Sequence, residues 1–287
     1  GNKITERHAI TVGMQKAAFC LFLVIQLVVM ITRPLSDPSE CRYGNLAANM
    51  AATGNFIEPK FIYQGVMQCF EGKPPLFFQA GGVSCLLFGK SAFAVRFPSF
   101  VCSLLTVWFV YWFVRRAGNR KTAWTAVLLC YLNPMFYVFS GRCLTDMMLT
   151  TCIVGGVAAY AGFSLETRRQ SSKWCSILFF ASLAIGMLVK GPVAIVSIGL
   201  PVLMFVAITG KWNKLRNHAW IRGSLVLAAL ALPWYVMMCR INPDFLHYFL
   251  YNENFARFFL KDYGDKFGSG HESFRGVAFL ISLAANL

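Results

Sequence analysis

Carboxylate and guanidinium groups lie close together in the polar segment that follows the first long apolar run. This segment contains Asp37, Glu40 and Arg42. A positioned carboxylate can act as a general base, and either Glu40 or Asp37 is a candidate for that role. The planar guanidinium of Arg42 can bind a phosphate through two parallel hydrogen bonds. A local ion pair between Glu40 and Arg42 at a helix start is the alternative, and the residues leave both interpretations open.

Two lysines are held where apolar runs begin or break. Gly72 precedes Lys73 and two prolines follow it, so the ammonium is fixed near the membrane plane. Lys190 stands before Gly191-Pro192 inside an apolar stretch, where an ionisable group is costly. A fixed ammonium at headgroup depth suits a lipid phosphate, although lysines near helix ends commonly reach for the interface without any ligand.

Asp146 opens a further apolar run directly after a short polar segment. It either stabilises a helix N-terminus, an effect of about 0.3–1 kcal/mol, or provides a second active-site carboxylate. Arg257 and His271 lie in a later polar segment, where contact with a substrate and a solvated loop face are equally compatible with the sequence. The four histidines are scattered, so we assign no metal ligands and leave a divalent metal as an open alternative.

The composition points to a lipid environment. The chain has 287 residues, of which 57% are hydrophobic and only 14% charged, so an all-α polytopic membrane protein is expected. Its net charge of +15 is concentrated in short segments between apolar runs, and no nucleic-acid-binding motif accompanies it. We therefore expect membrane lipids as partners and no nucleic acid. Most cysteines lie in apolar runs, and a disulfide between Cys41 and Cys69 is an option if their side of the membrane is oxidising.

Seven runs are suitable for spanning a bilayer. They cover approximately residues 17–32, 97–114, 122–140, 147–165, 174–189, 193–208 and 223–239, and another begins at 276. Residues 76–89 are apolar but short, and we expect a re-entrant or juxtamembrane helix there. With that choice all the dense basic segments fall on one side, as the positive-inside rule requires.

This topology puts the candidate residues on the extracytoplasmic face of a multi-pass protein of the inner (plasma) membrane. Residues 33–96 form the first extracytoplasmic loop, with juxtamembrane helices, and residues 240–275 form a later one. We interpret residues 1–287 as one transmembrane domain and as the N-terminal part of a longer chain.

The order of the polar blocks resembles that of the GT-C membrane glycosyltransferases, specifically the family of bacterial lipid A aminoarabinose transferases and protein O-mannosyltransferase relatives. The matching blocks are Ser39-Glu40-Cys41-Arg42-Tyr43, Asn49-Met50, Gly54-Asn55-Phe56, Gly72-Lys73-Pro74-Pro75, Phe88-Gly89, Phe93-Ala94-Val95-Arg96, Asp146, Lys190-Gly191-Pro192, Pro233-Trp234, Glu253-Asn254 and Arg257-Phe258. Two departures stand out. Ser39 replaces an Asp of the family pattern, and Gly72 stands beside Lys73 where aminoarabinose transferases carry Glu, which puts a metal-binding glutamate there in doubt.

The resemblance implies a GT-C-like helix bundle that transfers a sugar, with inversion, from a polyprenyl-phosphate donor to a lipid A-like lipid or to another extracytoplasmic acceptor, a glycan or protein. The residues it implies are Glu40, Asp146 and Asp37 for catalysis, Arg42, Tyr43, Lys73 and Lys190 for the donor phosphate, and Glu71, Arg257 and His271 for other substrate contacts. A protein O-mannosyltransferase-type enzyme is one alternative. A transporter or flippase for lipid-linked substrates is another, but its charges belong near the bilayer midplane.

Overall fold

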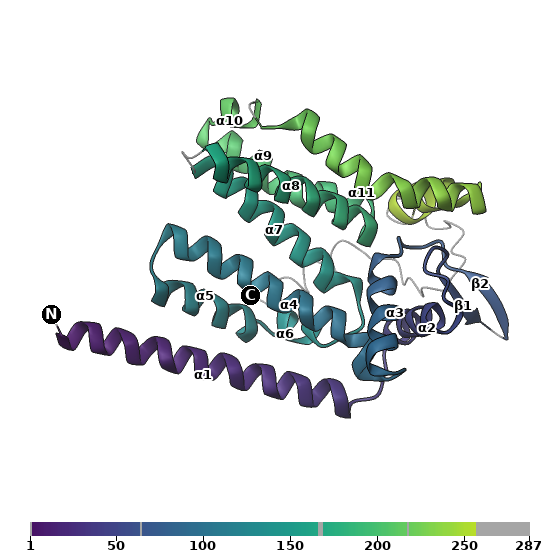
Figure 1. Ribbon diagram of the computed structural model, residues 1–287, viewed down its shortest axis with the longest axis horizontal. Coiled ribbons are helices and arrows are strands. Elements are labelled where there is room, and N and C mark those ends of the chain that lie inside the picture. The colour runs from purple at the N-terminus through teal and green to yellow at the C-terminus, as the bar shows by residue number, and fades with distance from the viewer. Residues whose placement is uncertain (1, 64, 166–168, 217, 257–287) are drawn as a thin grey trace.

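The structure is a bundle of long helices that run between two ends of the molecule (Figure 1). This computed structural model describes residues 2–63, 65–165, 169–216 and 218–256. The long helices are α1 (Asn2–Thr32), α4 (Ala92–Ala117), α7 (Thr145–Leu165), α8 (Arg169–Lys190), α9 (Pro192–Thr209) and α11 (Trp220–Ile241). Within the described residues, each of these six contains a stretch long and apolar enough to cross a membrane, which confirms the predicted all-helical polytopic class.

The span predicted over residues 122–140 is broken into two helices. α5 (Arg120–Leu132) and α6 (Pro134–Ser140) meet at Asn133 with a bend of 76°. Pro134 provides no backbone N–H for a continuous helix, and the side chain of Asn133 accepts a hydrogen bond from Phe136 N at the start of α6. The two helices together are long and apolar enough for the predicted span, which is bent rather than continuous.

Short elements gather at one end of the bundle (Figure 1). They are α2 (Pro38–Thr53), the antiparallel strands β1 (Lys60–Tyr63) and β2 (Val66–Cys69), α3 (Leu76–Phe88), α12 (Phe245–His247) and the π-helix η1 (Tyr248–Ala256). The 13 residues of α3 extend about 20 Å, too short for a bilayer core of about 30 Å. The prediction of a short juxtamembrane helix there agrees with this length, whereas the small hairpin was not predicted.

A cluster of buried side chains fixes these short elements to the bundle. Tyr43 of α2, Phe70 after β2, Phe78 of α3, Val95 of α4 and Cys143 before α7 all belong to it. The helices α2 and α3 approach closely because α3 carries glycine where they meet: a Cβ on residue 81 would lie 2.7 Å from the Cβ of Ala47. Small residues at such contacts are typical of membrane helix packing.

The basic segments lie together at one end of the molecule, as the expected topology requires. Figure 1 shows the α4–α5 turn and α10 (Trp212–Arg216) at the end of the bundle opposite to α2 and α3. The basic residues Arg115, Arg116, Lys214 and Arg216 thus share one end of the molecule. All ten cysteines are free thiols, so the optional Cys41–Cys69 disulfide is not formed.

Candidate active site

A partly exposed ion pair joins two helix termini at the α2–α3 end. Asp146 lies in the first turn of α7, and Lys190 is the last residue of α8. Lys190 Nζ is 2.7 Å from Asp146 Oδ1, and the side chains are 20% and 42% exposed, respectively. A carboxylate at a helix N-terminus and an ammonium at a C-terminus are both favoured by the helix dipoles. The pair leaves Asp146 Oδ2 facing outward with no hydrogen-bond partner among the described residues.

The turn after Lys190 requires glycine. Gly191 has a φ of 70°, which L-residues rarely adopt, and a Cβ there would overlap the ring of Phe249 in η1. Pro192 follows as the first residue of α9, where its missing N–H costs nothing. The Gly191-Pro192 turn therefore lets η1 pack directly against the end of α8 and fixes the position of Lys190.

Packing around Leu76 brings the segment of Lys73 to this ion pair. Leu76, the first residue of α3, packs against Leu149 of α7 and Val189 of α8. Leu149 lies about one helical turn after Asp146, and Val189 directly precedes Lys190. Lys73 is half-buried, three residues before Leu76. The structure thus pairs two of the predicted site residues, Asp146 and Lys190, and packs the start of α3, three residues after Lys73, against the same helix ends.

Glu40 has a different environment from the one that a general base needs. Glu40 is only 1% exposed, and its two carboxylate oxygens accept hydrogen bonds from Arg96 Nε at 2.8 Å and Arg96 Nη2 at 3.0 Å. The backbone N–H of Cys143 donates a further hydrogen bond to it at 2.9 Å. Burial acts to raise the pKa of Glu40, but the hydrogen bonds from Arg96 and Cys143 outweigh it and leave the pKa lower than usual. The assignment of Glu40 as base is therefore corrected: it is a buried structural anion.

Arg96 joins the ends of three elements, and the sequence analysis gave it no role. Besides Glu40 of α2, its guanidinium donates to the carbonyl oxygens of Met30, Arg33 and Pro34, at and beyond the end of α1. Arg96 itself belongs to the first turns of α4. The sequence signal that could have found this role is an arginine at the start of an apolar run. A guanidinium buried there requires a carboxylate partner.

Asp37 and Tyr43 also have structural contacts. Asp37 Oδ1 accepts from Ser39 N at 2.8 Å and Glu40 N at 3.2 Å, so Asp37 is the N-cap of α2, and its role as a base stays a prediction. The ring of Tyr43 is buried against Phe70 and Phe78, with centroids 6.1 and 5.2 Å away, and its contact with the donor phosphate stays a prediction. Arg42 is half-buried.

Glu71 is a buried carboxylate tied to the end of α11. It accepts a hydrogen bond from Asn242 Nδ2, and the residue is 6% exposed. Beside it, Gly72 approaches Glu253 of η1: a Cβ on Gly72 would be 3.7 Å from the carboxyl carbon of Glu253. Tyr248 donates to Glu253 at 3.2 Å. Within the described part of the chain, no group of three or more His, Cys, Asp or Glu side chains could hold a metal ion.

An apolar groove of about 470 Å³ begins one turn before Lys190. Its lining comes from α8, α11, α12 and η1, namely Met187, Leu232, Tyr235, Val236, Cys239, Arg240, Leu246 and Leu250. Tyr235 donates a hydrogen bond to Met187 O at 2.8 Å, which ties α11 to α8 along the groove. Arg257 and His271, the last two predicted site residues, lie outside the described residues.

Comparison with known proteins identifies the family. The sequence profile of the dolichyl-phosphate-mannose-protein mannosyltransferases matches residues 17–249. The chain belongs to that family. Two curated relatives are undecaprenyl phosphate-alpha-4-amino-4-deoxy-L-arabinose arabinosyl transferases, one from Erwinia tasmaniensis, 28% identical over 251 residues, and one from Proteus mirabilis, 30% identical over 247 residues. The alignments cover 85% and 83% of this chain but only 44% and 42% of the relatives, so the chain spans less than half of their length.

A solved structure shows the same fold for this member of the mannosyltransferase family. The crystal structure of ArnT from Cupriavidus metallidurans bound to undecaprenyl phosphate superposes with a TM-score of 0.79 at 23% sequence identity. The match covers 85% of this chain and 45% of that one. The similarity confirms the GT-C-like helix bundle expected from the order of the polar blocks.

Proposed function

We propose that this chain forms the catalytic membrane part of a glycosyltransferase that uses a polyprenyl-phosphate sugar donor. The observation that carries this proposal is the half-exposed Asp146–Lys190 ion pair beside the Lys73 segment, at a membrane-spanning bundle's end. Relatives of the same family are named for transfer from an undecaprenyl-phosphate sugar, which supports this donor class. The acceptor is a lipid A-like lipid or another extracytoplasmic molecule.

The proposed reaction is a single displacement with inversion. An acceptor oxygen forms a bond to the anomeric carbon while the bond from that carbon to the donor phosphate breaks, and its electron pair leaves with the polyprenyl phosphate. Lys190, Lys73 and Arg42 stabilise the charge on the leaving phosphate. Asp146 Oδ2 orients the acceptor and takes up its proton where the acceptor oxygen carries one.

The apolar groove beside Lys190 is the proposed position of the donor's polyprenyl chain. Its side chains are those of a lipid-facing surface, and it starts at Met187, one helical turn from the proposed phosphate contact. A lipid carrier placed there would have its phosphate at the level of Lys190. This arrangement puts the charges at a helix end, whereas a flippase would need them near the midplane.

We assign the α2–α3 end to the extracytoplasmic side of the inner membrane. The basic residues of the α4–α5 turn and of α10 lie at the opposite end, and such residues accumulate on cytoplasmic segments. The donor phosphate and the acceptor would then meet outside the cytoplasm. This assignment agrees with the proposed extracytoplasmic loops, residues 33–96 and 240–275.

The test uses the full-length protein in vesicles with a polyprenyl-phosphate sugar. Asp146→Asn should reduce turnover by about 10²–10⁴-fold, the usual contribution of a positioned proton-transfer group. Lys190→Gln should reduce it by about 10²–10³-fold, the usual contribution of a group that stabilises developing charge, and the double variant should lose less than the product of the two. Asp244→Asn is the matched control, because Asp244 is exposed and makes no side-chain cap bond. Unchanged turnover in Asp146→Asn would contradict the proposal.

A further inference from the structure

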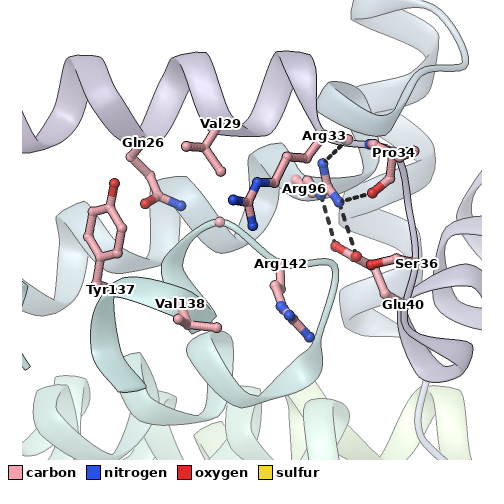
Figure 2. Close-up of a pocket in the computed structure, with 11 residues that line it drawn as sticks. Gln26, Val29, Arg33, Pro34, Ser36, Glu40, Arg96, Tyr137, Val138 and Arg142 are labelled. Atoms are coloured by element: carbon pink, nitrogen blue, oxygen red, sulfur yellow. Dashed lines mark hydrogen bonds and ion pairs between the residues drawn. The ribbon is translucent and has the colours of Figure 1, made fainter. Parts of the chain in front are cut away.

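A polar cavity lies between α1, α6 and the loop after α6 (Figure 2), and its lining includes neither Asp146 nor Lys190. Its volume is about 190 Å³, roughly the room of six water molecules at about 30 Å³ each. It is lined by Gln26, Val29, Arg33, Pro34, Ser36, Glu40, Arg96, Tyr137, Val138, Gly141 and Arg142. The bend between α5 and α6 turns α6 by 76°, and Tyr137 and Val138 of α6 form one side of the cavity.

The charge in this cavity favours an anion. Arg96 is neutralised by Glu40, as described above, and contributes little net charge. Arg33 reaches into the cavity, and no partner for its guanidinium occurs in the part of the chain that the structure describes (Figure 2). Arg142 has only a distant carboxylate, that of Asp37 at 3.9 Å. Both arginines line the cavity with cationic side chains that solvent can reach, and guanidinium groups are well suited to binding phosphate.

The buried side-chain amide of Gln26 on α1 favours a ligand that can donate a hydrogen bond. Gln26 is 2% exposed, and its Oε1 has no hydrogen-bond partner among the described residues. A buried polar atom without a partner is costly, so a ligand that supplies one is favoured. The backbone at Gly141 holds the amide in place, because a Cβ there would overlap it. Figure 2 shows Gln26 on the same side of the cavity as Tyr137.

We propose that this cavity binds a lipid-borne phosphate ester whose headgroup also carries hydroxyl groups. The phosphate lies against Arg33 and Arg142, and a headgroup hydroxyl donates to Gln26 Oε1. The cavity opens at the end of α1, whose apolar side chains Ile25 and Val28 are exposed and can lie along the lipid tails. A phospholipid such as phosphatidylglycerol and a phosphorylated glycolipid share this chemistry. The site does not depend on the proposed transferase reaction.

Native mass spectrometry of the full-length protein measures each lipid separately. Phosphatidylglycerol should bind about tenfold more tightly than phosphatidylcholine, because choline adds a positive charge beside the two arginines and has no hydroxyl to donate to Gln26 Oε1. Arg33→Gln and Arg142→Gln should each weaken phosphatidylglycerol by roughly tenfold. Gln26→Leu should weaken phosphatidylglycerol but leave phosphatidylmethanol, which has the phosphate and no hydroxyl, unchanged. Arg120→Gln, an exposed arginine at the opposite end, is the matched control.

The remaining arms distinguish the sources of the phosphate. If a phosphorylated glucosamine lipid displaces phosphatidylglycerol, the site exists and its ligand is a glycolipid. If that lipid does not compete, the site exists and its ligand is a phospholipid. Four results would each overturn the proposal. Two concern the ligand: complete displacement of phosphatidylglycerol by inorganic phosphate, or binding of phosphatidylcholine as tight as that of phosphatidylglycerol. Two concern the variants: binding of phosphatidylglycerol by both arginine variants like the wild type, or a loss of binding in Arg120→Gln as large as theirs. Equal effects of Gln26→Leu on phosphatidylglycerol and phosphatidylmethanol would also overturn it.

Discussion

Replacing Glu40 by Gln separates a structural anion from a catalytic base, because the two roles predict opposite results. Glu40→Gln preserves the shape of the side chain and removes its charge, which leaves the Arg96 guanidinium buried without its carboxylate. Removal of one partner of a buried ion pair costs about 3–5 kcal/mol. We expect a loss near the lower limit, about 3 kcal/mol, because three backbone carbonyls still accept from Arg96.

Replacing Arg96 instead of Glu40 should lower the free energy of unfolding further. Arg96→Met leaves Glu40 with the hydrogen bond from the Cys143 N–H, so the expected loss is near the upper limit of about 5 kcal/mol. The variant that combines Glu40→Leu with Arg96→Met removes both charges together, and it should lose less free energy of unfolding than the sum of the single changes.

The pH dependence has a definite sign. The pKa of Glu40 is lower in the folded protein than its ordinary value of 4.5, so its ionisation stabilises the fold above that pH. The stabilisation is lost as the pH falls through the folded-state pKa. The difference in stability between the wild type and Glu40→Gln should therefore be constant near neutral pH and decrease below about pH 4.5.

The assay combines thermal unfolding with turnover of a polyprenyl-phosphate sugar well below the unfolding midpoint. Glu40→Gln should lower the midpoint by roughly 6–12 °C, at about 2–4 °C per kcal/mol for a chain of this size. Turnover per folded molecule should remain within a few fold of the wild type. An unchanged midpoint together with a loss of about 10²–10⁴-fold in turnover would refute the structural role and restore Glu40 as the base.

Three further outcomes test the site and its orientation. Lys73→Ala should weaken donor use by about ten- to a hundredfold in steady-state kinetics, because a charge-assisted contact to phosphate is lost, whereas Lys90→Ala on the exposed α3–α4 turn should not. Gly191→Ala should lower the unfolding midpoint, since its φ of 70° and the ring of Phe249 exclude a Cβ; a wild-type midpoint would contradict the packing described. With native cysteines removed, a cysteine at Ser39 should react with an impermeant reagent outside the cell and one at Asn119 should not, and labelling at Asn119 would invert the topology.

The membrane architecture was predictable because lipid leaves few options. Long apolar runs must be helical in a bilayer, and the spacing of charged segments fixes which helix ends lie together. The break at Asn133 was missed because Pro134 was counted as one residue of an apolar run, although a proline inside a helix ends or kinks it. The hairpin of β1 and β2 was missed because two strands of four residues have too short a pattern to be distinguished from a loop.

The residue types at the site were predictable, but their pairing was not. Asp37, Glu40 and Arg42 are neighbours in sequence, and this proximity suggested that they act on one another. In the folded chain Glu40 is paired with Arg96, 56 residues away, and Asp37 caps the helix on which Glu40 lies. Such pairings depend on which face of α2 is buried, and that is decided by packing against α3 and α4 rather than by local sequence.

Two ion pairs at the same end of the bundle differ in exposure, and this difference assigns their roles. The Glu40–Arg96 side chains are almost inaccessible, and every oxygen of the carboxylate is bonded, so a substrate would gain nothing there without breaking the joint between α1, α2 and α4. Asp146 keeps 42% of its side chain exposed and has one oxygen available. Removing the first pair should therefore change stability, and removing the second should change turnover.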